Sequence, residues 1–323
     1  MVAISQLSFP RHSAKTQRFT LGAPRTFTIS PDGQRILFVR SHSGTDRIGR
    51  LYQYDIHSDG EELLVDPLNL LVDGTEELSA EERARRERTR EAAGGITSYS
   101  TDEKCERITF VLSGKLYLFD IPKKKLTELA SASVVIDPQL APDGSAVAYI
   151  TPDGELHLSR DGNVEVLCVP EHEDIFYGTA EFVASEEMSR HHGFWWCADS
   201  KSLFVERFDQ SPVRKVWISD PANPDNPPRE VRYPFVGSPN VITSLFLLTI
   251  GDKSRKEIHW NSEHEYLCSV NPGDGKVPPL ILTMSRNQRR AEISAIDPDS
   301  AQARVIADVK DSAWIRSEEH TSE

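Results

Sequence analysis

The sequence predicts an all-β protein, and within that class a β-propeller, from three observations. Turns of the Pro-Asp-Gly type recur along the chain, short β-branched or aromatic runs follow each turn, and the copies begin 41 to 70 residues apart. In such a turn proline sets φ, aspartate bonds to its own backbone, and glycine takes the positive φ that closes the turn. The flanking runs have the length of strands with turn signals on both sides, so the chain is expected to be all-β.

Five copies of this unit can be followed in order. Each pairs a turn with two predicted strands: turn 30–33 with 36–39 and 51–55, turn 100–103 with 108–111 and 116–120, turn 141–144 with 147–150 and 156–158, turn 197–200 with 203–206 and 216–220, and turn 260–263 with 266–268 and 291–295. The shortest step matches a four-stranded blade of ~40–50 residues, and the longer steps predict insertions. A β-sandwich is the alternative architecture, but it does not predict repeated copies of one unit.

Two short helical insertions are expected. Residues 79–91 are rich in glutamate and arginine, with Ser79 placed as N-cap and Glu82 at the capping-box position. The second helix is predicted over residues 178–190, stopped at Gly193. It carries Glu186 and Glu187. From the residue types alone, the two glutamates are either a solvated pair or two carboxylates that bind a cation such as a peptide α-amino group.

Composition excludes several classes of function. The chain of 323 residues has 50 acidic and 37 basic side chains and a net charge of −13, which argues against a nucleic-acid binder. No apolar stretch approaches the ~20 residues of a membrane span, and no secretory signal is recognisable, so a cytoplasmic location is expected. The four cysteines are widely spaced and are expected to be buried thiols, with disulfides or zinc as the alternative. No cofactor or metal is expected, since the histidines lack ligand spacing.

Three segments carry a family resemblance. Residues 181–196, Glu-Phe-Val-Ala-Ser-Glu-Glu-Met-Ser-Arg-His-His-Gly-Phe-Trp-Trp, closely resemble the double-glutamate segment of the dipeptidyl peptidase IV family of prolyl-oligopeptidase-type serine peptidases. Residues 219–224 followed by 228–234 are also similar to that family. Residues 85–90 followed by 95–99 are similar to its bacterial members and to its cytosolic branch, which includes dipeptidyl peptidases eight and nine.

The resemblance implies a fold and a role. It implies an eight-bladed propeller that caps an α/β-hydrolase domain, with Glu186 and Glu187 holding the amine of a peptide substrate that has a free N-terminus. By matching position Arg90, and after it Arg88, would fix the substrate carbonyl. Residues 1–315 are then expected to form about five of the eight blades, and a homodimer is possible. The alternative is a stand-alone, non-enzymatic propeller that mediates protein–protein interaction.

The catalytic machinery of such a hydrolase has no counterpart in this sequence. None of the 18 glycines is followed two positions later by serine, so there is no Gly-x-Ser-x-Gly elbow and no triad can be assigned. We therefore expect the α/β-hydrolase domain to be absent and the chain alone to be inactive. Residues 316–323 resemble the translation of a sequencing-adapter oligonucleotide and are expected to be an artefactual tail, the alternative being a disordered acidic terminus.

Overall fold

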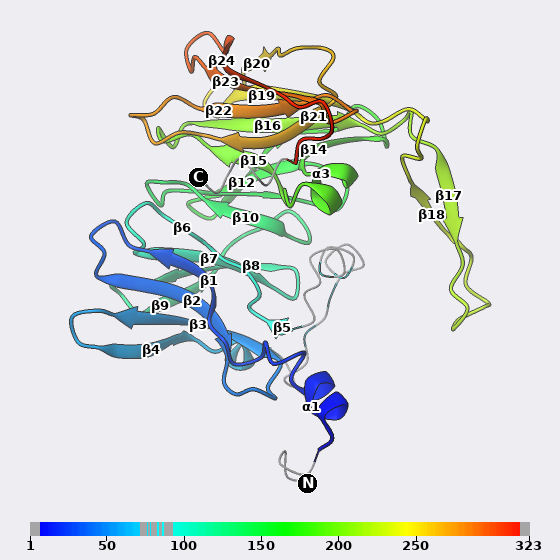
Figure 1. Ribbon diagram of the computed structural model, residues 1–323. Coiled ribbons are helices and arrows are strands. Elements are labelled where there is room, and N and C mark those ends of the chain that lie inside the picture. The colour runs from blue at the N-terminus through cyan, green and yellow to red at the C-terminus, as the bar shows by residue number, and fades with distance from the viewer. Residues whose placement is uncertain are drawn as a thin grey trace. The chain divides into compact units, whose positions relative to one another are not determined.

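The computed structural model describes residues 7–71, 76, 78, 83, 86 and 93–316. Within these residues the strands form five sheets of four or five strands and one two-stranded hairpin (Figure 1). Four of the five large sheets are built from strands that follow one another in the chain, and the fourth skips the two strands of the hairpin; neighbouring strands are mainly antiparallel. Successive four-stranded sheets are the organisation of propeller blades, so the predicted all-β, propeller-type fold is confirmed. The number of large sheets in the described residues equals the five predicted copies.

The chain divides into two compact units. The first comprises residues 1–152 and 158–165, and the second comprises residues 153–157 and 166–323. The division falls within strands β12 (Leu156–Arg160) and β13 (Asn163–Cys168), which contribute residues to both units.

The first unit holds two complete sheets and part of a third. The strand orders are β1-β2-β3-β4, with β5 parallel to β3, then β6-β7-β8-β9, and then β10-β11 of the sheet that continues into β12 and β13. The elements are α1 (Phe9–Lys15), β1 (Arg25–Ile29), β2 (Arg35–Ser41), β3 (Ile48–Asp55), β4 (Gly60–Val65), the 3-10 turn η2 (Pro67–Asn69), β5 (Gly94–Gly95), β6 (Ser100–Thr101), β7 (Arg107–Leu112), β8 (Lys115–Asp120), β9 (Lys125–Glu128), β10 (Ile136–Leu140) and β11 (Val147–Ile150). One core lies between the first two sheets, around Leu37, Leu51 and Phe110, and a second lies around Leu116 and Tyr149.

The second unit holds the fourth and fifth sheets. The fourth has the order β14-β15-β16-β19-β20 and the fifth the order β21-β22-β23-β24. The elements are β14 (Ile175–Thr179), α3 (Phe182–Glu187), β15 (His192–Trp196), β16 (Ser202–Asp209), β17 (Lys215–Ile218), β18 (Arg229–Arg232), β19 (Ile242–Thr249), β20 (Arg255–Ile258), β21 (Tyr266–Asn271), β22 (Leu280–Met284), β23 (Arg290–Ile296) and β24 (Ala303–Lys310). Buried Phe204, Leu245, Leu267 and Ile281 pack in one apolar core of this unit.

The Pro-Asp-Gly turns close as predicted. In the first, the Ser30 backbone N–H donates to the Arg35 carbonyl over 2.9 Å, and Ser30 Oγ accepts the Arg35 N–H over 2.9 Å. Residues 285–290 repeat both bonds, from the Ser285 N–H to the Arg290 carbonyl over 2.9 Å and from the Arg290 N–H to Ser285 Oγ over 3.1 Å. The same turn therefore forms from a sequence with neither proline nor glycine, which the sequence pattern did not reveal as a copy.

Two predicted copies were wrong in detail. Residues 216–220 were predicted as a blade strand after β16, but β17 pairs only with β18 among the described strands, and the place beside β16 is taken by β19 over eight residue pairs. The apolar β19 can be buried in the sheet, whereas Trp217 and Ile218 of β17 remain exposed. The predicted fifth turn, at 260–263, connects the fourth sheet to the fifth instead of joining two strands of one sheet.

The helices also differ from expectation. Helix α1 was not predicted, although Ser8 in an extended N-cap conformation and Pro10 in the first turn are helix-start signals. Most of the predicted helix over residues 79–91 lies outside the described residues. Helix α3 is shorter than the 178–190 predicted, because residues 178–179 and 192–193 pair as strands.

Candidate functional site

The candidate site lies on a segment that interrupts one strand of the fourth sheet. β14 and β15 both pair with β16, the former at Ile175–Tyr177 and the latter at Phe194–Trp196. They therefore act as two halves of one split strand, and residues 178–193 leave the sheet between them as what we call the α3 excursion. Gly178 pairs with Gly193 at its base. A Cβ on Gly193 would lie 2.5 Å from the Gly178 carbonyl carbon, so the residue predicted to stop the helix is in fact part of a close antiparallel strand pairing.

Buried polar and apolar groups hold α3 in place. Glu181 caps the helix, accepting the N–H of Val183 over 2.7 Å and of Ala184 over 2.6 Å. Val183 and Met188 pack with Cys268 and Met284 of the fifth sheet, so one side of α3 is docked on an apolar core.

Glu186 and Glu187 occupy the last two positions of α3, and both are exposed. Adjacent helix residues lie about 100° apart around the axis. Acidic side chains in the last turn oppose the helix dipole, which favours basic residues there. Local helix stability therefore does not account for this pair.

A buried ion pair anchors the end of the excursion. Arg190 Nη2 donates to Glu206 Oε1 over 2.9 Å, and Arg190 Nη1 donates to Glu206 Oε2. The Glu206 side chain is 0% exposed and that of Arg190 is 6% exposed. Arg190 also donates to the carbonyls of His192, over 2.9 Å, and Leu267, over 3.2 Å. Sequence analysis did not identify this pair, although a lone glutamate in the apolar run Leu-Phe-Val-Glu was a signal for it.

The same carboxylates have perturbed pKa values. Burial, followed by the neighbouring Glu206 charge, raises the pKa of Glu181 to about 7. Burial also raises the pKa of Glu206, opposed by the Arg190 charge. The interior beneath α3 therefore holds two carboxyl groups and one guanidinium in a desolvated setting.

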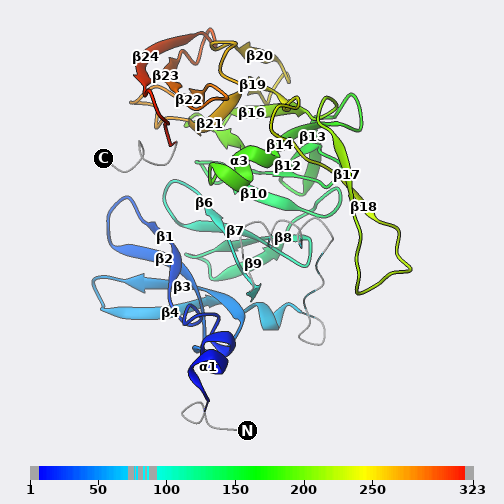
Figure 2. The same cartoon turned by 45° about the vertical axis from the view of Figure 1, so that its right-hand side comes forward.

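The hairpin of β17 and β18 touches the start of α3. We call residues 210–241 the hairpin arm; in both views it stands clear of the sheets of its unit (Figures 1 and 2). Its return strand brings Tyr233 edge-on to Phe182, with ring centroids 5.5 Å apart, and Tyr233 in turn contacts Phe235. At the base of the arm, Arg232 binds Asp174 through two hydrogen bonds of 2.8 and 2.6 Å.

The two predicted arginines, Arg88 and Arg90, lie outside the described residues. Of that insertion the structure describes two arginines: Arg83, which is exposed, and Arg86, which is buried and bonds to Glu76 and to the Ala93 carbonyl. Arg86 is therefore part of the packed structure and does not face the solvent.

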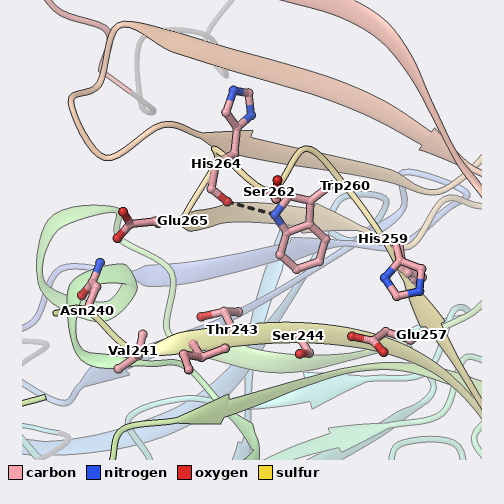
Figure 3. Close-up of a pocket in the computed structure, with 12 residues that line it drawn as sticks. Asn240, Val241, Thr243, Ser244, Glu257, His259, Trp260, Ser262, His264 and Glu265 are labelled. Carbon is pink, nitrogen blue, oxygen red and sulfur yellow. Dashed lines mark hydrogen bonds between the residues drawn. The ribbon is translucent and has the colours of Figure 1, made fainter. Parts of the chain in front are cut away.

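A separate cavity of about 340 Å³ lies along β19, β20 and the turn to β21 (Figure 3). None of the predicted site residues lines it. Trp260 Nε1 donates to the His264 carbonyl over 3.0 Å, while the His264 ring points away from Thr243 and Ser244 and bonds Thr283. Burial lowers the pKa of His264, since a desolvated site disfavours the charged imidazolium.

Three further features of the chain are its thiols, its potential metal ligands and the apolarity of its helices. All four cysteines are unpaired, three of them buried, in agreement with the sequence. Among residues 7–71, the isolated described positions and 93–316, no three His, Cys, Asp or Glu side chains are grouped to hold a metal. No helix in that same part of the chain has the length and apolarity to cross a membrane.

Comparison with known proteins agrees with the propeller-type fold. The crystal structure of Porphyromonas gingivalis dipeptidyl peptidase 4 aligns with a TM-score of 0.74 and 17% identity, over 98% of this chain and 44% of that one. At this identity the likeness shows the shared fold.

Sequence comparison gives the family. Residues 98–322 match the dipeptidyl peptidase IV N-terminal region, so the chain belongs to the dipeptidyl peptidase IV family. It is 24% identical over 260 residues to the probable dipeptidyl-aminopeptidase B of Aspergillus oryzae, covering 69% of this chain and 27% of that protein. It is 24% identical over 312 residues to the one of Emericella nidulans, covering 88% and 33%. The chain thus spans about a quarter to a third of these curated relatives.

Proposed function

We propose that this chain is the substrate-anchoring propeller region of a serine dipeptidyl peptidase, with Glu186 and Glu187 binding the α-amino group of the substrate. The observation that carries the proposal is the exposed glutamate pair at the end of α3, set between buried Ala184 and buried Met188. A protonated amine offers N–H donors that suit two carboxylates, and such charge-assisted bonds are among the stronger ones in proteins. Holding the amine at a set distance from the reacting serine would leave room for two residues before the cleaved bond.

The rest of the proposed enzyme is outside this chain. An α/β-hydrolase domain would supply the serine, histidine and aspartate of the acyl-transfer reaction, and Arg90, or else Arg88, would bind the substrate carbonyl. We further propose that the protein is nearest to the bacterial members and the cytosolic branch of the family, with a cytoplasmic location. The support is the resemblance of residues 85–90 and 95–99 to these members, together with the four unpaired cysteines.

We also propose that the protein forms a homodimer through the hairpin arm. Trp217 is 64% exposed on β17, and Ile218 beside it is half exposed. An isolated two-stranded hairpin is only marginally stable in water, so a large exposed indole on one favours a partner surface.

The test uses the product of the complete reading frame and a chromogenic dipeptide anilide, with its N-acetylated form as the second substrate. Glu186→Gln or Glu187→Gln should lower kcat/KM for the free-amine substrate at least 30-fold, since breaking a charge-assisted contact that the bound substrate shields from water costs about 2–5 kcal/mol. Glu257→Gln, an exposed glutamate on β20, is the matched control and should change kcat/KM less than twofold. Equal activity on the acetylated substrate would contradict the amine anchor.

The alternative is a stand-alone propeller that binds a protein partner, and the gene sequence distinguishes it from the peptidase proposal. If the peptidase proposal is right, long-read sequencing downstream of the codon for Ile315 should find an open frame that reaches a Gly-x-Ser-x-Gly. A genuine stop codon after Glu323 would favour the partner-binding function instead.

A further inference from the structure

The position of Glu206 is unusual for a charged residue. On β16, residues 203–205 pair with β15 and residues 207–209 pair with β14, so Glu206 lies at the break between the two halves of the split strand. On its other side β16 continues without a break, with Glu206 opposite Leu245 of β19. The carboxylate is therefore buried at the point where the α3 excursion leaves the sheet.

Arg190 fills that break from the excursion. Its guanidinium reaches Glu206 on β16, the His192 carbonyl at the start of β15, and the Leu267 carbonyl on β21. One planar side chain thus ties the returning end of the excursion to two sheets of the same unit. The planar guanidinium presents its N–H donors in a fixed arrangement that suits these three acceptors, and a lysine ammonium would not reproduce that arrangement.

The connection from Arg190 to the glutamate pair is short. The Arg190 N–H donates to the Ala184 carbonyl over 3.1 Å, and the Met188 N–H donates to the same carbonyl over 3.2 Å. Ser189 takes a φ of +53° between them, which closes the chain tightly after α3. Glu186 and Glu187 therefore lie inside a closed turn whose far end is Arg190.

Stability alone is a weak reason for such a pair. Replacing a buried ion pair with apolar residues of similar volume is often neutral or stabilising, because desolvation offsets the attraction. An apolar pair cannot form the directional hydrogen bonds by which Arg190 joins Glu206, at the break in the split strand, to the backbone of the α3 excursion.

We propose that Arg190, held by Glu206, is a positioning residue that sets the location of the Glu186–Glu187 pair for amine binding. This inference rests on the proposed function. Arg190 is enclosed by Glu206 and two carbonyls, so it acts on the substrate only through the placement of the two exposed carboxylates.

The test combines kinetics of the full reading-frame product with hydrogen exchange on this chain. Arg190→Lys keeps the charge and loses the fork, and Glu206→Asp keeps the charge but withdraws the acceptor by one methylene. The matched control is Arg50→Lys in the first unit, where a buried arginine also binds two carboxylates, Asp46 and Asp66.

We expect Arg190→Lys and Glu206→Asp to raise KM for the free-amine anilide at least tenfold and to reduce its preference over the acetylated anilide. The amides of Met188 and Arg190 should exchange at least tenfold faster in both variants, and Arg50→Lys should change neither readout. Because KM and substrate preference do not depend on the amount of folded enzyme, a merely structural role would lower only the maximal rate.

The outcomes separate the inference from the proposed function. If Glu186→Gln and Glu187→Gln leave KM and the acetylation preference intact, the proposed function fails whatever Arg190 does. If those variants lose the preference while folded Arg190→Lys and Glu206→Asp retain KM, the positioning role alone is overturned. Should Arg190→Lys fail to fold, Glu206→Asp decides the question, and unchanged exchange at Met188 in that variant refutes the link.

Discussion

Two segments leave the fourth sheet, and they are held in opposite ways. The α3 excursion departs within the split strand and returns through the fully buried Arg190–Glu206 pair and the packed Met188. The hairpin arm departs between β16 and β19, and its base is held by the Asp174–Arg232 pair, in which both side chains retain 12–13% exposure. Beyond that base its strands present Trp217 and Ile218 to solvent.

The difference shows how one sheet supports two kinds of surface. A desolvated polar link confines the excursion to one geometry, as the amine-binding role proposed for Glu186 and Glu187 requires. The arm has few buried apolar contacts, so it is expected to open locally at a lower free energy than the sheet. The exposed glutamates of the α3 excursion are therefore expected to be held more rigidly than the exposed apolar residues of the hairpin arm.

The largest effect should come from unpairing the buried charge. Arg190→Met leaves Glu206 buried without its partner and should lower the free energy of unfolding by about 3–5 kcal/mol. Arg232→Met at the base of the arm should cost about 1–3 kcal/mol, since water can reach the remaining carboxylate. Urea unfolding of both variants is the measurement, and equal losses would contradict the comparison.

The next effect is a pH dependence that belongs to the excursion. With its pKa raised to about 7 against an ordinary value of 4.5, folded Glu181 binds a proton in this window that the unfolded chain has released. Its contribution to stability therefore falls as pH rises from about 4.5 to 7, by on the order of 3 kcal/mol. Glu181→Gln should flatten that part of the stability–pH curve, and the exposed Glu103→Gln should not. An unchanged slope in Glu181→Gln would show that Glu181 is ionised throughout.

A smaller effect is expected at the base of the excursion. Gly193→Ala places a methyl group within 2.6 Å of three backbone atoms of Gly178 and Thr179, and the overpacking should cost about 1–3 kcal/mol. Gly251→Ala, where nothing lies within 4 Å, is the control and should be neutral or slightly stabilising. Thermal unfolding of the two variants compares them directly, and an unchanged unfolding temperature in Gly193→Ala would argue against the close pairing of Gly193 with Gly178.

The smallest effect on stability should come from the arm. Trp217→Ser removes an exposed side chain and should change the free energy of unfolding by no more than about 0.5 kcal/mol. If the arm mediates a homodimer, the same variant should shift the sedimentation of the protein toward the monomer. Unchanged self-association would rule out Trp217 as part of the contact.

Local chemistry explains how much of the fold could be predicted. The turn at 30–33 and the apolar runs that became β2, β7, β11 and β16 carry short-range signals, so their structure was predictable. The turn at 285–288 was not recognised as a copy of the turn at 30–33, because serine and asparagine form its bonds without proline or glycine. The placement of 216–220 failed because β17 and β19 compete for the same sheet edge, and only burial decides between them.

The same division applies to the candidate site. From the sequence alone it was predictable that two adjacent glutamates lie in a helix-forming segment, and the motif around them indicated the family. The packing of the folded chain was needed to show that the helix ends at Glu187, that Gly193 permits a close strand pairing, and that Arg190 meets Glu206 across 16 positions of sequence. The physical reason is that a buried charge is tolerated only where its partner is brought to it, and that meeting depends on where the split strand breaks, which is not a local property of either segment.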